Sequence, residues 1–191
     1  NLMPKVVHFT GYPGSGKGTQ SEFLINHMKY VHFSVGELMR GEIKSGSEMG
    51  KQLDQIINKG NIAPAEMTMQ IIKKHVTNPK YDHTVVILDG FPRTVEQAKM
   101  YNEIVGPADL TMIFVVPEDE CKRRLLQRGQ NSDRADDKPE VLEKRFVQFY
   151  QQTVPAIEFV KQSGNKFVEI DGHGPMEEVF ERVVDVLKNR M

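Results

Sequence analysis

A glycine-rich segment near the start of the sequence holds residue types that bind phosphate. Positions 11–20 read Gly-Tyr-Pro-Gly-Ser-Gly-Lys-Gly-Thr-Gln. An apolar run that is typical of a strand, Val6–Thr10, precedes this segment, and a helical pattern, Ser21–Lys29, follows it. A strand, a glycine-rich loop with a lysine in register and the start of a helix, in this order, indicate a phosphate-binding loop.

The residue types explain how such a loop would work. Glycines let the backbone bend so that successive N–H groups point at a polyphosphate, and the following helix N-terminus adds partial positive charge. Lys17 adds a point charge that reaches the β and γ oxygens. The alternative is a glycine-rich turn that contains a lysine by chance, and the strand on the correct side argues against it. The sequence therefore predicts a nucleoside triphosphate site at Gly14, Ser15, Gly16, Lys17, Gly18 and Thr19.

Two oxygen-bearing residues are candidates for contact with the Mg²⁺ that accompanies a triphosphate. In the general motif a serine or threonine directly follows the lysine. Here Gly18 follows Lys17, and the hydroxyl-bearing residue is Thr19, one position later. Further along, the apolar run Val85–Leu88 ends in Asp89, which begins the segment Asp-Gly-Phe-Pro-Arg. Asp-Gly alone is also typical of a turn. Beside a phosphate loop, an aspartate at a strand end holds a water of the bound metal, and we expect that role for Asp89.

Short apolar runs alternate with helical patterns along the whole chain. The expected strands are Val6–Thr10, Val31–Ser34, Val85–Leu88, Thr111–Val116 and Lys166–Ile170. The expected helices are Ser21–Lys29, Val35–Lys44, Met49–Lys59, Glu66–Val76, Val95–Val105, Pro117–Arg128, Pro139–Gln162 and Met176–Arg190. Strands that are apolar on both faces suit a parallel sheet between helices. We expect an α/β fold of three layers with a central parallel five-stranded sheet, and a ligand at the carboxyl ends of its strands.

Composition and charge limit the classes of partner. The 191 residues have an ordinary hydrophobic content of 39% and a formal net charge of −1, so no overall charge attracts nucleic acid or an anionic membrane. The single cysteine, Cys121, excludes an intrachain disulfide and a zinc site made of several cysteines. No apolar run approaches the ~18 residues of a membrane helix, and the start does not resemble a signal peptide. We expect one domain over 1–191 that acts as a cytoplasmic monomer.

Three segments together resemble motifs of the nucleoside monophosphate kinases. They are the loop at 11–20, Asp-Gly-Phe-Pro-Arg at 89–93 and Asp-Arg-Ala-Asp-Asp at 133–137. The likeness is greatest to the short-lid adenylate kinases and extends from about Lys5 to Leu187. It implies a P-loop fold with a helical insertion at about 34–63 that binds the monophosphate, and a short lid at about 127–137. It also implies reversible, Mg²⁺-dependent phosphoryl transfer from ATP to AMP that gives two ADP, without a structural zinc.

The resemblance assigns residues to each nucleotide. Besides the loop residues 14–19, it places Arg124, Arg128 and a backbone contact of Gly174 at ATP. At AMP it places Val35, Arg40, Asn61, Ile62, Ala63, Gly90, Arg93, Gln97, Arg134 and Arg145. Lys17, Arg93, Arg128, Arg134 and Arg145 form the implied catalytic set.

Arginine suits this chemistry because its planar fork binds two phosphate oxygens and keeps its charge. Arg124 and Arg128 are four residues apart and share a helix face, which would also be consistent with a solvated face that has no ligand. Arg145 has the same alternative explanation.

The sequence leaves the acceptor base open between AMP and the UMP/CMP alternative. Gln97 favours adenine, because its amide can pair with the donor and acceptor edge of that base. Val35, where many adenylate kinases have threonine, and the run Glu66-Met67-Thr68 favour a pyrimidine.

Two departures from the family pattern also bear on activity. Tyr12 is bulkier than the usual loop residue and can narrow the donor side, and Asp133 replaces a glycine beside Arg134. Together they leave a catalytically silent nucleotide sensor as an alternative. A nucleotide-hydrolysing switch is a further alternative, although Arg40 and Arg93 are better explained by a second phosphorylated substrate.

Overall fold

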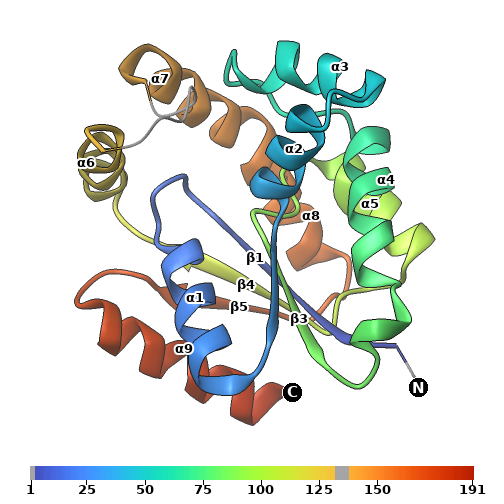
Figure 1. Cartoon of the computed structure of the whole chain (residues 1–191). Coiled ribbons are helices and arrows are strands. Elements are labelled where there is room, and N and C mark those ends of the chain that lie inside the picture. The colour runs from blue at the N-terminus through green and yellow to red at the C-terminus, as the bar shows by residue number, and fades with distance from the viewer. Residues whose placement is uncertain (1–2, 132–137) are drawn as a thin grey trace.

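The computed structural model describes residues 3–131 and 138–191 (Figure 1). The chain forms a five-stranded parallel sheet with the strand order β2-β3-β1-β4-β5. The strands are β1 Lys5–Gly11, β2 Val31–Ser34, β3 Val85–Asp89, β4 Leu110–Val115 and β5 Phe167–Asp171. This result confirms the expected α/β fold. Arg134, Asp133 and positions 132–137 of the expected lid lie outside the described residues.

Helices cover both faces of the sheet and its carboxyl edge. They are α1 Lys17–Met28, α2 Val35–Lys44, α3 Glu48–Ile57, α4 Ala65–Val76, α5 Val95–Ile104, α6 Glu118–Gly129, α7 Pro139–Gln148, α8 Val154–Gln162 and α9 Met176–Arg190, with a 3₁₀ turn η1 Pro79–Tyr81 and a π-helical turn η3 Phe149–Thr153. In Figure 1, α1 and α9 lie on one face, and α4, α5 and α8 lie on the other. The pair α2 and α3 and the pair α6 and α7 stand over the carboxyl ends of the strands.

The two faces of the sheet bury separate sets of alternating residues. In β1, Val7 and Phe9 pack with Leu24 of α1 and Val183 of α9. Val6, from the opposite face, belongs to the cluster that includes residues of α2 to α5. Because successive side chains of a strand point to opposite faces, this alternation produces three layers.

The strand register brings chemically active residues to one edge. Phe9 of β1 lies opposite Asp89 of β3, and Ser34 of β2 lies opposite the same aspartate. The strands are parallel, so their carboxyl ends meet where β1 continues into the phosphate loop.

The segment between β2 and α4 contains α2 and α3 and no strand, as expected. Both helices begin with a serine cap. Ser34 Oγ accepts a hydrogen bond from Glu37 N, and Ser47 Oγ accepts one from Gly50 N at 2.9 Å. A Cβ at Gly50 would lie 2.3 Å from the carbonyl oxygen of Glu42, so the close packing of α3 on α2 requires glycine there.

The structure corrects two of the expected helices. The pattern at Pro139–Gln162 is not one helix, because the π-helical turn η3 separates α7 from α8. Pro155 lies in the first turn of α8, and proline can neither donate a backbone hydrogen bond nor accommodate the carbonyl four residues earlier. The first helix begins at Lys17 rather than at Ser21, directly after the left-handed Gly16.

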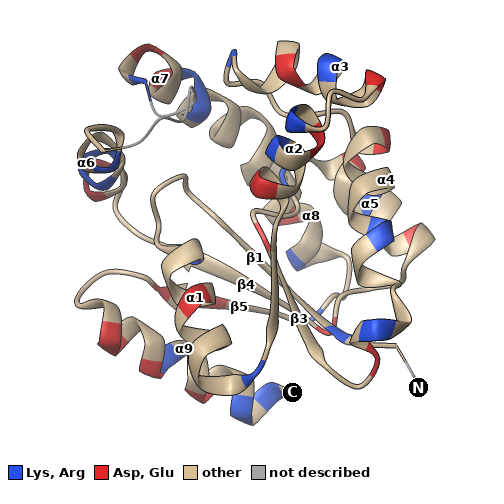
Figure 2. Cartoon of the chain, in the orientation of Figure 1, with Lys and Arg blue, Asp and Glu red and all other residues tan. Residues whose placement is uncertain are grey.

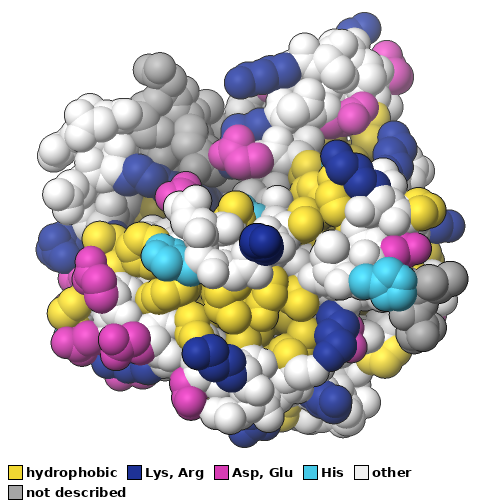
Figure 3. Space-filling model, turned by 60° about the horizontal axis from the view of Figure 1, so that its bottom comes forward, with side chains coloured by type: hydrophobic (Ala, Val, Ile, Leu, Met, Phe, Trp, Pro, Cys, Tyr) yellow, Lys and Arg dark blue, Asp and Glu magenta, His cyan; other side chains and the backbone are white. Residues whose placement is uncertain are grey.

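Charges of both signs are distributed over the surface (Figure 2), as the formal net charge of −1 suggests. The face seen in Figure 3 also shows a hydrophobic area with Lys and Arg side chains beside it. Within residues 3–131 and 138–191, no helix is both long enough and apolar enough to cross a membrane.

Candidate active site

A cavity of about 950 Å³ opens at the carboxyl ends of the strands. A smaller pocket adjoins it, and both are lined by Gly36, Ile57, Asn61, Ile62, Arg93 and Arg145. The predicted residues that line the cavity are Gly14, Ser15, Gly16, Lys17, Gly18, Thr19, Asn61, Ile62, Asp89, Gly90, Arg93, Arg124, Arg128, Arg145 and Gly174. The smaller pocket adds Val35, Arg40, Ala63 and Gln97. The fold therefore gathers into one continuous site every predicted residue that the structure describes.

The phosphate loop has backbone geometry that only glycine adopts readily. Gly14 and Gly16 have φ of 81° and 92°. A Cβ at Gly14 would lie 2.6 Å from the carbonyl oxygen of Cys121 in α6, so the loop also packs too closely for a side chain. Gly16 precedes α1 without a side-chain cap, which leaves the helix N-terminus to the cavity. N–H groups in this setting are suited to bind phosphate oxygens.

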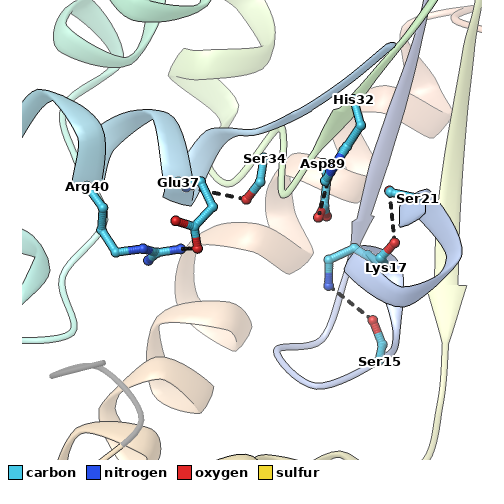
Figure 4. A network of polar contacts seen from close by, with 8 residues as sticks. All are labelled: Ser15, Lys17, Ser21, His32, Ser34, Glu37, Arg40 and Asp89. Carbon is cyan, nitrogen blue, oxygen red and sulfur yellow. Dashed lines mark hydrogen bonds and ion pairs between the residues drawn. The ribbon is translucent and has the colours of Figure 1, made fainter. Parts of the chain in front are cut away.

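Lys17 points back into the loop (Figure 4). Its ammonium donates to Gly11 O at 3.1 Å, Tyr12 O at 2.7 Å and Ser15 Oγ at 3.1 Å. Burial lowers the pKa of Lys17 to about 8, and the negative charge of Asp89 opposes this shift. Phosphate oxygens at this position would favour the charged form, so the loop holds a cation that an anionic ligand would stabilise.

Asp89 lies beside the phosphate loop. If Gly18 carried a Cβ, this atom would be 3.7 Å from Asp89 Oδ2. His32 of β2 also reaches this carboxylate, with 3.4 Å between Nε2 and Oδ2 (Figure 4). In the described part of the chain, no group of three or more His, Cys, Asp and Glu side chains is placed to hold a metal. Asp89 and Thr19 line the same cavity. One carboxylate and one hydroxyl fit Mg²⁺, which keeps several waters and takes its other ligands from phosphates.

Arg93 is held at the junction of the cavity and the smaller pocket. Its Nε donates to Gly90 O at 2.9 Å, and its backbone N donates to Gln97 Oε1 at 2.9 Å. Its carbonyl oxygen accepts a hydrogen bond from Thr153 Oγ1 of η3 at 3.0 Å. Contacts from three segments thus fix both the backbone and the guanidinium of this arginine.

Arg124 and Arg128 both line the cavity, so their shared helix face is not simply turned to solvent. Arg124 Nε donates to Glu120 Oε1 at 2.7 Å, and Arg123 binds both oxygens of the same carboxylate at 2.8 Å. Hydrogen bonds from Arg123 and Arg124 lower the pKa of Glu120 to about 2. This anion keeps Arg124 at the cavity wall.

The smaller pocket lies against α2. Arg40 contacts Glu37 Oε1 at 2.5 Å, and Figure 4 shows both side chains on the same helix near Ser34. Val35 and Gln97 are 2% and 1% exposed, so they border the pocket from within the protein interior.

Several polar residues of the site were missed by sequence analysis, namely His32, Glu37 and Glu120. Glu37 precedes Arg40 by three residues, and Glu120 precedes Arg124 by four. Residues at these spacings are neighbours on a helix surface, so the sequence could have predicted both ion pairs. His32 gave no local signal, because its contact depends on the pairing of β2 with β3.

Comparison with known proteins agrees with this arrangement. The family model described as adenylate kinase matches residues 9–165. An adenylate kinase of Phocaeicola vulgatus is 40% identical over 186 residues, which cover 95% of this chain and 97% of the relative. One of Bacteroides fragilis is 41% identical over 97% of this chain and 100% of its own length. UMP-CMP kinase 3 of Arabidopsis thaliana is 38% identical over 94% of this chain and 87% of its own.

The family match spans most of the chain, from β1 to the end of α8, and includes the phosphate loop, Asp89 and the arginines that line the cavity. The chain therefore belongs to the adenylate kinase family.

Proposed function

We propose that this protein transfers the γ-phosphoryl group of Mg-ATP to AMP in a reversible reaction that yields two ADP. The observation that carries the proposal is the continuity of the site. The phosphate loop lines the large cavity, Arg40 and Gln97 line the adjoining pocket, and Arg93 and Arg145 line both. Two phosphorylated substrates, one in each part, would meet at these two arginines.

The donor nucleotide would occupy the larger cavity. The backbone of residues 14–19 would bind the polyphosphate, with Lys17 at the β and γ oxygens and Arg124 and Arg128 lining the same cavity. A Cβ on Gly16 would lie 3.7 Å from Arg124 Nη1, so this arginine is beside the loop. The backbone of Gly174, after β5, would contact the adenine. Asp89 would hold a water of the Mg²⁺, with Thr19 as a second candidate ligand, and the ion supplies charge neutralisation of the phosphate oxygens.

The acceptor would lie in the smaller pocket. Arg40 and Arg93 would bind the α-phosphate of AMP, Gln97 would contact the base, and Val35, Asn61, Ile62, Ala63 and Gly90 would form the walls. An α-phosphate oxygen would attack the γ-phosphorus in line as the bond to the β–γ bridging oxygen breaks. Arg93, Arg128 and Arg145, with Arg134 from outside the described residues, would stabilise the charge on the transferring group.

Water must be kept from this reaction, because it would otherwise take the phosphoryl group. We assign closure to the helical insertion at 34–63 and to the short lid at 127–137. One chain contributes the residues for both substrates, which supports a monomer. The single cysteine, Cys121, is buried and free, which is consistent with a reducing compartment such as the cytoplasm.

UMP/CMP kinase activity is the second candidate. It is favoured by the apolar Val35 in the acceptor pocket and by the run Glu66-Met67-Thr68 in the sequence. Relatives named UMP-CMP kinase are about as similar as those named adenylate kinase. Gln97 and the family match favour AMP.

Initial rates with Mg-ATP and each of AMP, CMP, UMP and GMP test the proposal, with diphosphates read by chromatography. We expect AMP to give the highest kcat/KM by about tenfold or more. A pyrimidine monophosphate as the best acceptor would establish the second candidate. Hydrolysis of ATP without transfer would indicate a switch, and binding without reaction would indicate a sensor.

A further inference from the structure

Thr68 of α4 is not among the residues assigned to the site, yet it contacts one of them. Its side chain is fully buried, and its Oγ1 lies 3.2 Å from Nε2 of Gln97. The same hydroxyl donates to the carbonyl oxygen of Pro64 at 2.9 Å. Since its one proton is used there, Thr68 faces Gln97 as a hydrogen-bond acceptor.

The other contacts of the Gln97 amide fix the same orientation. Its Oε1 accepts from the backbone N–H of Arg93 at 2.9 Å, and its Nε2 donates to the carbonyl oxygen of Ala63 at 3.2 Å. If the amide were rotated by a half-turn, its NH₂ group would face the backbone N–H of Arg93, so that two donors would meet. Its oxygen would face the carbonyl oxygen of Ala63 and the hydroxyl oxygen of Thr68, so that acceptors would meet. Only one orientation satisfies all three neighbours.

This orientation limits what Gln97 can offer to a ligand in the pocket. A primary amide has two N–H donors and an oxygen with two acceptor positions. Both donors are used by Ala63 and Thr68, and one acceptor position is used by Arg93. The remaining capacity is one acceptor position on Oε1, so Gln97 faces a nucleobase as an acceptor.

We propose that Thr68 is a positioning residue that fixes the polarity of the Gln97 amide. The acceptor pocket thereby selects monophosphates whose base carries an amino group at C6 of a purine or at C4 of a pyrimidine. Adenine and cytosine carry an amino group there, whereas guanine and uracil carry a carbonyl oxygen that would meet the amide oxygen. The proposal rests on the proposed function, since it assigns the base to the pocket of Gln97.

The first test uses the wild-type protein and the two pyrimidine monophosphates, which differ at this group. We expect kcat/KM for CMP to exceed that for UMP by about tenfold or more, because one hydrogen bond is exchanged for an oxygen–oxygen repulsion. GMP should be disfavoured in the same way. Equal use of CMP and UMP would overturn the proposal.

The second test is Thr68→Val, which keeps the shape of the side chain and removes the acceptor. One of the three contacts that oppose the turned amide is then lost, so the orientation that donates to a carbonyl oxygen costs less, while Arg93 and Ala63 still favour the original orientation. We expect the UMP-to-CMP ratio of kcat/KM to rise about tenfold, with KM for ATP unchanged. Thr68→Ser, which keeps the hydroxyl, should preserve the wild-type ratio.

Thr77→Val is the matched control. Thr77 follows the same helix and donates to the carbonyl oxygen of Lys73 four residues earlier at 2.8 Å, in the same manner as Thr68. It should leave the base ratio unchanged. An unaltered ratio in a folded Thr68→Val protein would overturn the role of Thr68, and if that variant does not fold, the wild-type ratio decides. Absence of transfer to any monophosphate would instead refute the proposed function.

Discussion

The ring of Tyr12, in the phosphate loop, stacks on Phe149 with 4.1 Å between ring centroids and an interplanar angle of 28°. The Tyr12 hydroxyl also lies 2.7 Å from that of Tyr150, which in turn donates to Glu118 of α6. The ring thereby connects the phosphate loop to η3, the turn that separates α7 from α8.

This stacked pair should be energetically coupled. In a double-mutant cycle of Tyr12→Leu and Phe149→Leu, we expect a coupling of about 1 kcal/mol, the usual range for aromatic pairs beyond their buried area. Urea unfolding of the four proteins measures it. A cycle of Tyr12→Leu with Phe180→Leu in α9 is the control and should be additive. Additivity in the first cycle would refute the connection.

Arg93 is expected to stabilise the transferring phosphoryl group. Arg93→Ala should lower kcat at least about 100-fold, the scale of a lost electrostatic contact in the transition state. The backbone contacts of residue 93 remain in this variant and the hydrogen bond from Nε to Gly90 O is lost, so the unfolding free energy should fall by about 1 kcal/mol. Arg190→Ala, at the end of α9, controls for the loss of a charge. Near-normal turnover of Arg93→Ala would remove this residue from the mechanism.

Gln97 is expected to act on the acceptor and not on the donor. Gln97→Ala should raise KM for AMP by about tenfold or more while KM for ATP stays within about twofold, because only the acceptor pocket includes this residue. Steady-state kinetics with each substrate varied in turn makes the comparison. Equal losses for both nucleotides would show a general disruption of the site and contradict the assignment.

Asp89 is expected to hold Mg²⁺ through a water. Asp89→Asn should raise the Mg²⁺ concentration for half-maximal rate by about 10- to 100-fold, as for other groups that act on a metal through an intermediate ligand. A Mg²⁺ titration at saturating nucleotide measures the change. Asp185→Asn, exposed on α9, should behave as wild type. An unshifted titration of Asp89→Asn would exclude the carboxylate from the metal site.

His8 gives the protein a specific pH dependence of stability. Its ring is buried between Phe91 and Tyr101, at centroid distances of 5.0 and 4.4 Å, and burial lowers the pKa of His8 to about 3. The unfolded chain binds this proton near its ordinary pKa of 6.5. Neutral, buried His8 therefore makes its full contribution to the free energy of unfolding above pH 6.5. This contribution falls as the pH drops toward 3, because the unfolded state binds the proton and the folded state does not.

Between pH 7 and pH 5 the wild type should lose about 2 kcal/mol of unfolding free energy that His8→Met does not lose. Urea unfolding of both proteins at the two pH values isolates this histidine from other titrating groups. Identical pH dependence in both proteins would show that His8 has the same pKa in the folded and unfolded states.

Local signals in the sequence predicted much of the fold. Residues of α2 and α9 were assigned as observed, because a serine cap marks the start of α2 and a regular apolar stripe runs along α9. The phosphate loop and Asp89 were recognisable because their function depends on residues that are adjacent in sequence.

What the sequence did not show depends on tertiary contacts. The π-helical turn η3 was hidden inside a continuous helical pattern, although Pro155 was visible. Thr68 appeared in the sequence as a feature of one branch of the family, and its hydrogen bond to Gln97 joins residues 29 positions apart. Contacts of this kind require the packing of α4 on α5, which no local pattern specifies.

The central claim is that one site exchanges a phosphoryl group between two adenine nucleotides. It is tested most directly by incubating the wild-type protein with Mg²⁺ and ADP alone, and measuring ATP, AMP and inorganic phosphate by chromatography. We expect ATP and AMP to form in equal amounts without inorganic phosphate. AMP and phosphate without ATP, or no reaction of ADP, would contradict the account.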